Sequence, residues 1–153
     1  MIILIEGPDG AGKTTLAKKL AKLLKFQIVH MSYPKTEEEK QNMFQQYLAL
    51  IATSDGQNII LDRCWYSEMV YGPVKRDKSY ISLAQMSDLE HCVVNNGGGF
   101  IIYCSGNAKT LYERSKERGE DYITSLSELT NIVNLYDKMF KMPHYLPIIN
   151  YVI

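Results

Sequence analysis

Residues 7–14 have the types and the spacing to bind phosphate. They read Gly-Pro-Asp-Gly-Ala-Gly-Lys-Thr and fill every fixed position of the pattern Gly-x-x-x-x-Gly-Lys-Ser/Thr. The glycines let successive backbone N–H groups turn toward one anion. The Lys13 ammonium can reach terminal phosphates, and the Thr14 hydroxyl can ligate Mg²⁺. The predicted ligand is ATP with Mg²⁺, and the predicted nucleotide-binding residues are Gly7, Asp9, Gly10, Ala11, Gly12, Lys13, Thr14 and Thr15.

The sequence around this segment supplies the elements that position such a loop. An apolar run at residues 1–5 leads into it, and residues 15–25 carry leucines at helical spacing. A loop of this kind places phosphate at the helix N-terminus, where free N–H groups and the helix dipole attract anions. We therefore predict a strand, the glycine-rich loop and a helix in this order.

Asp62 and Arg63 form a second charged constellation at the end of an apolar run. In a chain with a phosphate-binding loop, a strand that ends in an acid is the Walker B arrangement, whose acid can hold Mg²⁺ directly or through water. The predicted metal ligands are therefore Thr14 and Asp62. Arg63 can bind an acceptor phosphate with two parallel hydrogen bonds.

Five continuous apolar runs alternate with helical patterns along the chain, which is typical of a parallel sheet with helices on both faces. The predicted strands are residues 2–6, 26–30, 58–62, 99–104 and 147–152. The predicted helices are residues 15–25, 36–53, 82–95, 108–118 and 126–141. We expect an α/β, three-layer fold of the P-loop NTPase type, with a five-stranded parallel sheet flanked by helices, in a single domain over residues 1–153.

Three segments resemble those of thymidylate kinases. Residues 6–15 look like the opening of these enzymes, and residues 62–71, Asp-Arg-Cys-Trp-Tyr-Ser-Glu-Met-Val-Tyr, resemble their Asp-Arg-aromatic-x-x-Ser-x-x-Ala-Tyr segment. Residues 32–36 resemble their aromatic-Pro-x-Arg segment, with Lys35 in place of the arginine. The first half of the chain matches well, and the second half matches more loosely through residues 113–121.

The resemblance implies a role for each matching residue. Asp9 corresponds to the acid that contacts the sugar 3′-hydroxyl of the acceptor, and Arg63 to the arginine on the acceptor phosphate. Ser67 and Tyr71 correspond to positions near the acceptor nucleotide, although both also fit ordinary packing. The implied substrate-binding residues are Asp9, Lys35, Arg63, Ser67 and Tyr71, and the implied catalytic residues are Lys13, Asp62, Arg63, Arg114 and Arg118.

Residues 109–124 are predicted to form a lid over the site. Arg114 and Arg118 lie four positions apart and share one face of a helix, which Gly119 then breaks. In small P-loop kinases, which this segment resembles, such arginines close over the transferring phosphoryl group, stabilise its charge and exclude water. The alternative is a solvated helix whose arginines pair with Glu113 and Glu117.

The sequence favours a phosphate over a hydroxyl as the acceptor group. A hydroxyl usually needs a base to take its proton, and related deoxynucleoside kinases place a carboxylate after the second strand. This chain has His-Met-Ser-Tyr at residues 30–33. A monophosphate is already an anionic nucleophile. We therefore predict ATP-dependent phosphoryl transfer to a nucleoside monophosphate. The thymidylate kinase resemblance implies a deoxynucleotide with a pyrimidine base, such as dTMP or dUMP.

One departure from the thymidylate kinase pattern leaves other functions open. Those enzymes carry a stacking aromatic and a base-reading arginine before the third strand, and residues 36–57 contain no matching Phe-x-x-x-Arg. A hydroxyl acceptor is the first alternative, either a deoxynucleoside or a hydroxymethylated base in DNA, the substrate of some virus-encoded relatives. The second alternative is a non-catalytic nucleotide-binding regulator, which Asp62, Arg63 and the paired lid arginines disfavour.

Composition narrows the choice of partners. The net charge is zero, so a nucleic-acid partner stays open but is not favoured. The basic run at residues 75–78 is interpreted as a solvated loop. No apolar run approaches the roughly 18–20 residues of a membrane span. Three cysteines without metal-pair spacing are typical of reduced thiols, so we expect a cytoplasmic enzyme. A homodimer also stays open.

Overall fold

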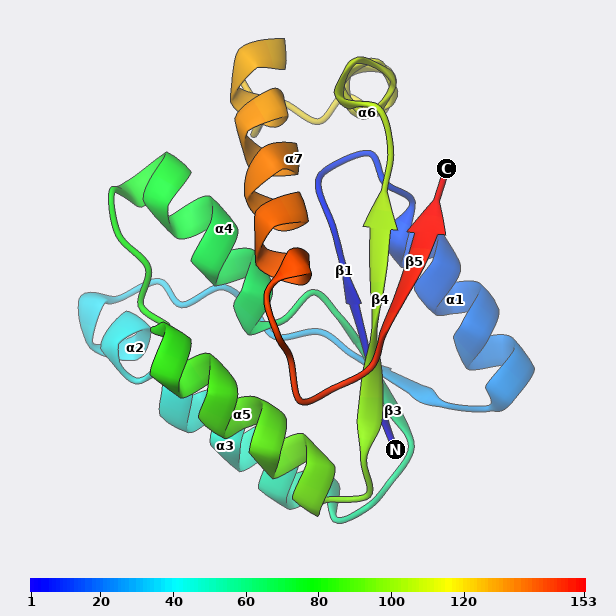
Figure 1. Ribbon diagram of the computed structural model, residues 1–153, viewed down its shortest axis with the longest axis vertical. Helices are drawn as coiled ribbons and strands as arrows, with labels where there is room; N and C mark the ends of the chain where they lie inside the picture. The colour runs from blue at the N-terminus through cyan, green and yellow to red at the C-terminus, as the bar shows by residue number, and fades with distance from the viewer.

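Five parallel strands form one sheet in the computed structural model, which describes residues 1–153 (Figure 1). The strand order is β2-β3-β1-β4-β5. The central strand β1 pairs with β3 on one side and with β4 on the other, and all of its residues are buried. The strands are β1 (Ile2–Glu6), β2 (Gln27–Val29), β3 (Ile59–Asp62), β4 (Gly99–Ser105) and β5 (Ile148–Val152).

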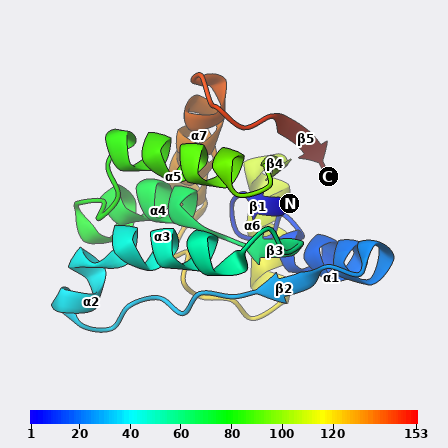
Figure 2. The same ribbon diagram turned by 90° about the horizontal axis from the view of Figure 1, so that it is seen from below.

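Helices cover both faces of the sheet, which confirms the predicted three-layer α/β fold. Helix α1 packs on one face, and α3, α4, α5 and α7 lie on the other (Figure 2). Helix α6 lies beyond the carboxyl end of β4 (Figure 1). The helices are α1 (Lys13–Leu24), α2 (Glu37–Gln41), α3 (Met43–Ser54), α4 (Trp65–Arg76), α5 (Leu83–Asn95), α6 (Ala108–Glu117) and α7 (Leu126–Lys141). No helix is long and apolar enough to cross a membrane.

Two helical segments differ from the sequence-based expectation. The single helix expected at residues 36–53 is divided into α2 and α3 at Asn42, which caps both. Helix α4 was not expected as a helix. It contains Pro73 and buries Trp65, Tyr66, Val70 and other residues around much of its circumference, so it lacks a simple apolar stripe.

A buried ion pair ties α5 to the segment that follows α7. Nδ1 of His144 lies 2.6 Å from Oε1 of Glu90, and both side chains are 1% exposed. The Tyr66 hydroxyl and the Tyr145 backbone N–H also donate to the Glu90 carboxylate, at 2.6 and 2.7 Å. Nε2 of His144 lies 2.8 Å from the carbonyl oxygen of Met139. Because both ring nitrogens face acceptors, this arrangement holds His144 as the imidazolium.

Replacing His144 with alanine is expected to lower the free energy of unfolding by about 3–5 kcal/mol, because Glu90 would stay buried without its cation. Burial alone would lower the pKa of His144, but its hydrogen bonds to Glu90 and to the Met139 carbonyl raise it above 6.5. Burial alone would raise the pKa of Glu90, but the hydrogen bonds from His144 and Tyr66 hold it below 4.5.

The pH dependence of stability tests this pair. The His144 contribution is complete below pH 6.5 and is lost as the pH rises through its raised pKa. The Glu90 contribution is complete above pH 4.5 and is lost as the pH falls through its lowered pKa. Urea unfolding should therefore show a difference between wild type and His144→Ala that narrows toward alkaline pH. The control is His30→Ala, which changes an exposed histidine of another part of the chain. A difference between wild type and His144→Ala that stays constant with pH would contradict the ion pair.

Candidate active site

The glycine-rich loop lies between β1 and α1, at the carboxyl edge of the sheet. Gly10 has a φ of +78°, and a Cβ atom there would lie 2.3 Å from the carbonyl oxygen of Leu111 in α6. Gly7 has a φ of +147°, and its Cβ would lie 2.1 Å from the carbonyl oxygen of Cys104. Only glycine fits either position, because both the left-handed backbone and the close contact exclude a side chain. Ala11 is fully buried behind the loop.

Lys13 and Thr14 begin α1 and face different partners. The Lys13 ammonium donates to the carbonyl oxygen of Pro8 at 2.6 Å. Burial, and then the nearby charge of Arg63, lower the pKa of Lys13 to about 7. The negative charge of a phosphate ligand would favour the ammonium form.

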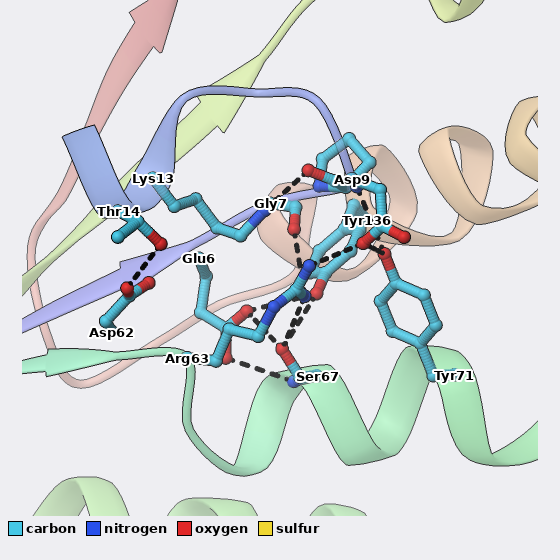
Figure 3. A network of polar contacts seen from close by, with 11 residues as sticks. Glu6, Gly7, Asp9, Lys13, Thr14, Asp62, Arg63, Ser67, Tyr71 and Tyr136 are labelled. Carbon is cyan, nitrogen blue, oxygen red and sulfur yellow. Dashed lines mark hydrogen bonds and ion pairs between the residues drawn. The ribbon is translucent and has the colours of Figure 1, made fainter. Parts of the chain in front are cut away.

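The Thr14 hydroxyl donates to a carboxylate oxygen of Asp62 at 2.7 Å, so the loop and the end of β3 meet as expected (Figure 3). Both residues offer oxygen atoms, which are the ligands that Mg²⁺ prefers. This ion commonly binds through one or two protein groups together with phosphates and waters. The pair therefore fits Mg²⁺ in the presence of a nucleotide.

Arg63 is held at the centre of a polar network (Figure 3). Its backbone has a φ of +69°, which is uncommon for a residue other than glycine. The guanidinium donates to the Asp9 carboxylate at 2.6 Å, to the carbonyl oxygen of Gly7 at 3.3 Å and to the Ser67 hydroxyl at 3.2 Å. It also lies over the Tyr71 ring, 5.2 Å from the centroid. These contacts fix the orientation of the guanidinium, although the Arg63 side chain is 35% exposed.

Asp9 is fixed by Tyr71 as well as by Arg63. The Tyr71 hydroxyl donates to the Asp9 carboxylate at 2.8 Å and accepts from the Asp9 backbone N–H at 3.2 Å. A residue of the glycine-rich loop is thereby joined to α4. Of the residues predicted from the thymidylate kinase resemblance, Asp9, Arg63, Ser67 and Tyr71 come together in this network.

Glu6, at the end of β1, accepts several hydrogen bonds within this network. The sequence did not identify it as a site residue. This fully buried carboxylate accepts from the backbone N–H groups of Cys64 and Ser67, at 2.8 and 3.1 Å. It also accepts from the hydroxyls of Ser67 and Tyr136, at 2.8 and 3.0 Å. Glu6 thus fixes the turn that contains Arg63 and the start of α4. The available sequence signal was an acidic residue at the end of an otherwise apolar strand.

Two cavities meet at this network. The smaller, of about 240 Å³, is lined by Gly10, Gly12, Lys13 and Thr14 of the loop and by Arg118 and Glu120 after α6. The larger, of about 540 Å³, extends between α3, α4 and the segment at residues 31–34. Asp9 and Arg63 line both cavities, so they form the wall that the two share.

A second charged pair, Glu68 and Arg76, lines the larger cavity. Nη2 of Arg76 lies 2.5 Å from Oε2 of Glu68, and the Arg76 guanidinium lies over the Tyr33 ring at 4.5 Å. Nε of Arg76 is buried and has no hydrogen-bond partner. The interpretation of residues 75–78 as a solvated loop was therefore wrong for Arg76, which ends α4 and faces the cavity. The last turn of a buried helix was mistaken for a loop because α4 itself was missed.

Some predicted residues lie outside both cavities. Arg118 lines the smaller cavity, whereas Arg114, one turn earlier on α6, does not. Lys35 and Thr15 are exposed and line neither cavity. Tyr47 of α3 is buried and also lines the larger cavity. The roles predicted for Arg114, Lys35 and Thr15 stay predictions.

The glycine-rich loop, the Walker acid and the adjoining cavities define the class of P-loop kinases. The family model described as Polyphosphate kinase 2 (PPK2) matches residues 1–127, and the chain belongs to this family.

The chain is 29% identical over 136 residues to the SPbeta prophage-derived uncharacterized protein YorR of Bacillus subtilis (strain 168), covering 88% of this chain and 79% of YorR. It is 32% identical over 115 residues to a protein named "Probable thymidylate kinase" of Metallosphaera sedula. This alignment covers 61% of this chain and 58% of the relative. It is 28% identical over 163 residues to the deoxyguanosine kinase of Bacillus subtilis (strain 168). This alignment covers 91% of this chain and 78% of the relative.

The structural comparison agrees with these relationships. The crystal structure of YorR in complex with phosphorylated GDP matches with a TM-score of 0.80 at 26% identity, covering 99% of this chain and 85% of YorR. The protein is a nucleotide-binding kinase, which transfers phosphoryl groups in the manner of nucleoside and nucleotide kinases. The narrower thymidylate kinase assignment and a viral source stay predictions.

Proposed function

We propose that this kinase transfers the terminal phosphoryl group of ATP, bound with Mg²⁺, to the phosphate of a deoxynucleoside monophosphate. The shared wall of the two cavities carries the proposal, because Arg63 and Asp9 face both sides of it. An acceptor phosphate in the larger cavity would meet the Arg63 guanidinium directly beside the phosphate-binding loop. Holding both reactants in one geometry supplies much of the catalysis in phosphoryl transfer.

The hydrogen bonds of the nearby carboxylates support a phosphate acceptor. Glu6 accepts from four donors, Asp9 is bound by Arg63 and Tyr71, and Asp62 is bound by Thr14. Each of these carboxylates is therefore already engaged in contacts within the protein. A phosphate acceptor needs no base, since its oxygen is already anionic.

The donor would bind in the smaller cavity, within a single domain whose lid is residues 109–124. Lys13 and the loop N–H groups would hold the terminal phosphates, and Arg118 would cover them. Thr14 and Asp62 would hold Mg²⁺, which neutralises charge on the phosphate oxygens when it is bound. Arg114 would join them only if α6 turned toward the cavity.

The Glu68 and Arg76 pair supports selection of a base with a ring N–H beside a carbonyl group. The carboxylate can accept from that N–H, and the guanidinium can donate to that oxygen. Thymine and uracil present this pattern, in keeping with the pyrimidine acceptor predicted from the sequence. Guanine presents it too, and the relatives named for deoxyguanosine kinase and crystallised with phosphorylated GDP make guanine the second candidate.

Glu68→Gln is expected to lower kcat/KM for the preferred acceptor about tenfold, the effect of losing one charge-assisted hydrogen bond. The loss should be smaller for dAMP, which lacks a ring N–H on its pairing edge. Steady-state kinetics with dTMP, dUMP, dGMP and dAMP measure this difference. Glu38→Gln, at an exposed glutamate of α2, is the matched control. An equal loss with every base would exclude base reading by Glu68.

An acceptor and donor panel tests the proposed function. ATP with Mg²⁺ is incubated with each deoxynucleoside and ribonucleoside monophosphate, with the nucleosides and with duplex DNA containing hydroxymethylated bases. Because the family is named for polyphosphate, polyphosphate replaces ATP in a second series. We expect diphosphate products from ATP and monophosphates. Turnover of nucleosides or DNA alone would replace the proposal with the hydroxyl acceptor.

A further inference from the structure

The segment after α6 reaches both cavities within a few residues. Arg118 and Glu120 line the smaller cavity, and Tyr122 lines the larger one. Residues 118–122 are exposed, whereas Ile123 is only 2% exposed. Arg118 and Tyr122, which line different cavities, are therefore separated by only three residues of backbone.

Tyr122 is held by residues that belong to the larger cavity and to α4. Its ring stacks on Tyr71 with centroids 6.1 Å apart and planes at 30°. Its hydroxyl accepts from Nη1 of Arg76 at 3.2 Å. The Lys75 ammonium lies 4.6 Å from the ring centroid and donates to the Tyr122 carbonyl oxygen. The position of this ring is thus set where an acceptor base would bind.

The same stack continues into the phosphate-binding loop. Tyr71 exchanges two hydrogen bonds with Asp9, so Tyr122, Tyr71 and Asp9 form a continuous path from the lid to the loop. The far end of the lid segment is anchored separately. The Lys116 ammonium donates to the Ile123 carbonyl oxygen at 2.7 Å, and Lys75 pairs with Glu128 of α7 at 2.5 Å.

We propose that Tyr122 is a positioning residue through which an occupied acceptor cavity holds Arg118 over the donor phosphate. The inference rests on the proposed function and adds an order of events to it. The acceptor binds first, and the lid closes fully only when the acceptor is bound. A bound base would contact Tyr122 and Arg76 and fix the ring. Tyr122 is 51% exposed despite its contacts with Tyr71 and Arg76, so a bound base would add to these contacts.

Lid closure that depends on a bound acceptor would favour phosphoryl transfer over hydrolysis of ATP. In transfer, an acceptor phosphate oxygen bonds to the γ-phosphorus of ATP as the bond from that phosphorus to ADP breaks. In hydrolysis, a water oxygen takes the place of the acceptor oxygen, and inorganic phosphate, ADP and a proton are released. A lid that closes only over a bound acceptor excludes the water that would otherwise compete.

The ratio of transfer to hydrolysis tests the proposal. With saturating ATP, Tyr122→Ala is expected to raise the acceptor KM and to lower that ratio about tenfold or more. Tyr122→Phe keeps the ring but loses the hydrogen bond from Arg76. Its ratio of transfer to hydrolysis should therefore lie between those of wild type and Tyr122→Ala. Tyr151→Ala changes an exposed tyrosine of β5 outside both cavities and should match wild type. A wild-type ratio in Tyr122→Ala would overturn the role.

Trypsin cleavage after Arg118 gives a readout that does not depend on turnover. With a non-hydrolysable ATP analogue present, adding the acceptor should slow cleavage in wild type but not in Tyr122→Ala. Equal protection in both would overturn the coupling. A wild-type enzyme that phosphorylates no monophosphate contradicts the proposed function itself, whereas transfer with an unchanged ratio in Tyr122→Ala contradicts only the role of Tyr122.

Discussion

Replacing Lys13 with alanine should lower the kcat of phosphoryl transfer by about 10²–10³-fold, the effect of removing one preorganised group that stabilises developing charge. The Lys13 side chain is buried, donates to the carbonyl oxygen of Pro8 and lines the smaller cavity. No neighbouring side chain replaces it at the start of α1, because Thr14 is directed to Asp62. The loss should appear in kcat with every acceptor, since the donor phosphates are common to all reactions.

The fold should survive this substitution. Lys13 makes one hydrogen bond, to the carbonyl oxygen of Pro8, and its removal leaves the hydrophobic core intact. Circular dichroism and urea unfolding of Lys13→Ala check this point before the kinetics are interpreted. A folded Lys13→Ala protein with full activity would contradict the assignment of the donor site.

Replacing Arg63 with alanine should lower kcat/KM for the acceptor by about 10²–10³-fold, because it removes a partly buried charge that several hydrogen bonds hold in place. The binding of ATP should change much less. Arg63 lies on the shared wall, and its guanidinium is directed by Asp9, Gly7 and Ser67. Acceptor-dependent kinetics together with an ATP binding titration separate the two effects.

Arg63→Lys is the matched variant for this prediction. Lysine keeps the charge but cannot form two parallel hydrogen bonds with a phosphate. Arg63→Lys should leave the acceptor kcat/KM well below that of wild type. It should be more stable to unfolding than Arg63→Ala, because it keeps a cation beside Asp9. An unchanged acceptor KM and rate in either variant would remove Arg63 from the acceptor site.

The sequence was sufficient for the parts of the molecule that depend on local pattern. The glycine-rich loop has a fixed spacing, and buried parallel strands appear as continuous apolar runs, so β1 and β3 could be located with the residues that follow them. Lys13, Thr14 and Asp62 could then be placed at one edge of the sheet, because ligands of such folds bind beyond the carboxyl ends of the strands.

The parts that the sequence left open depend on contacts between distant segments. Tyr136 reaches Glu6 across 130 positions, and no local pattern announces such a contact. Arg76 enters the larger cavity only because α4 continues through Pro73. Arg114 and Arg118 lie one turn apart at the end of α6, and only Arg118 lines the smaller cavity.

The transfer of a labelled phosphoryl group tests the central claim most directly. ATP labelled at the γ-phosphate is incubated with Mg²⁺ and the best monophosphate acceptor, and the products are separated. We predict that the label appears at the β-phosphate of the nucleoside diphosphate product, in a one-to-one ratio with ADP, and that Lys13→Ala lowers the rate of its appearance about 10²–10³-fold. Label found only in inorganic phosphate, or on a hydroxyl of a nucleoside or of DNA, would contradict the account.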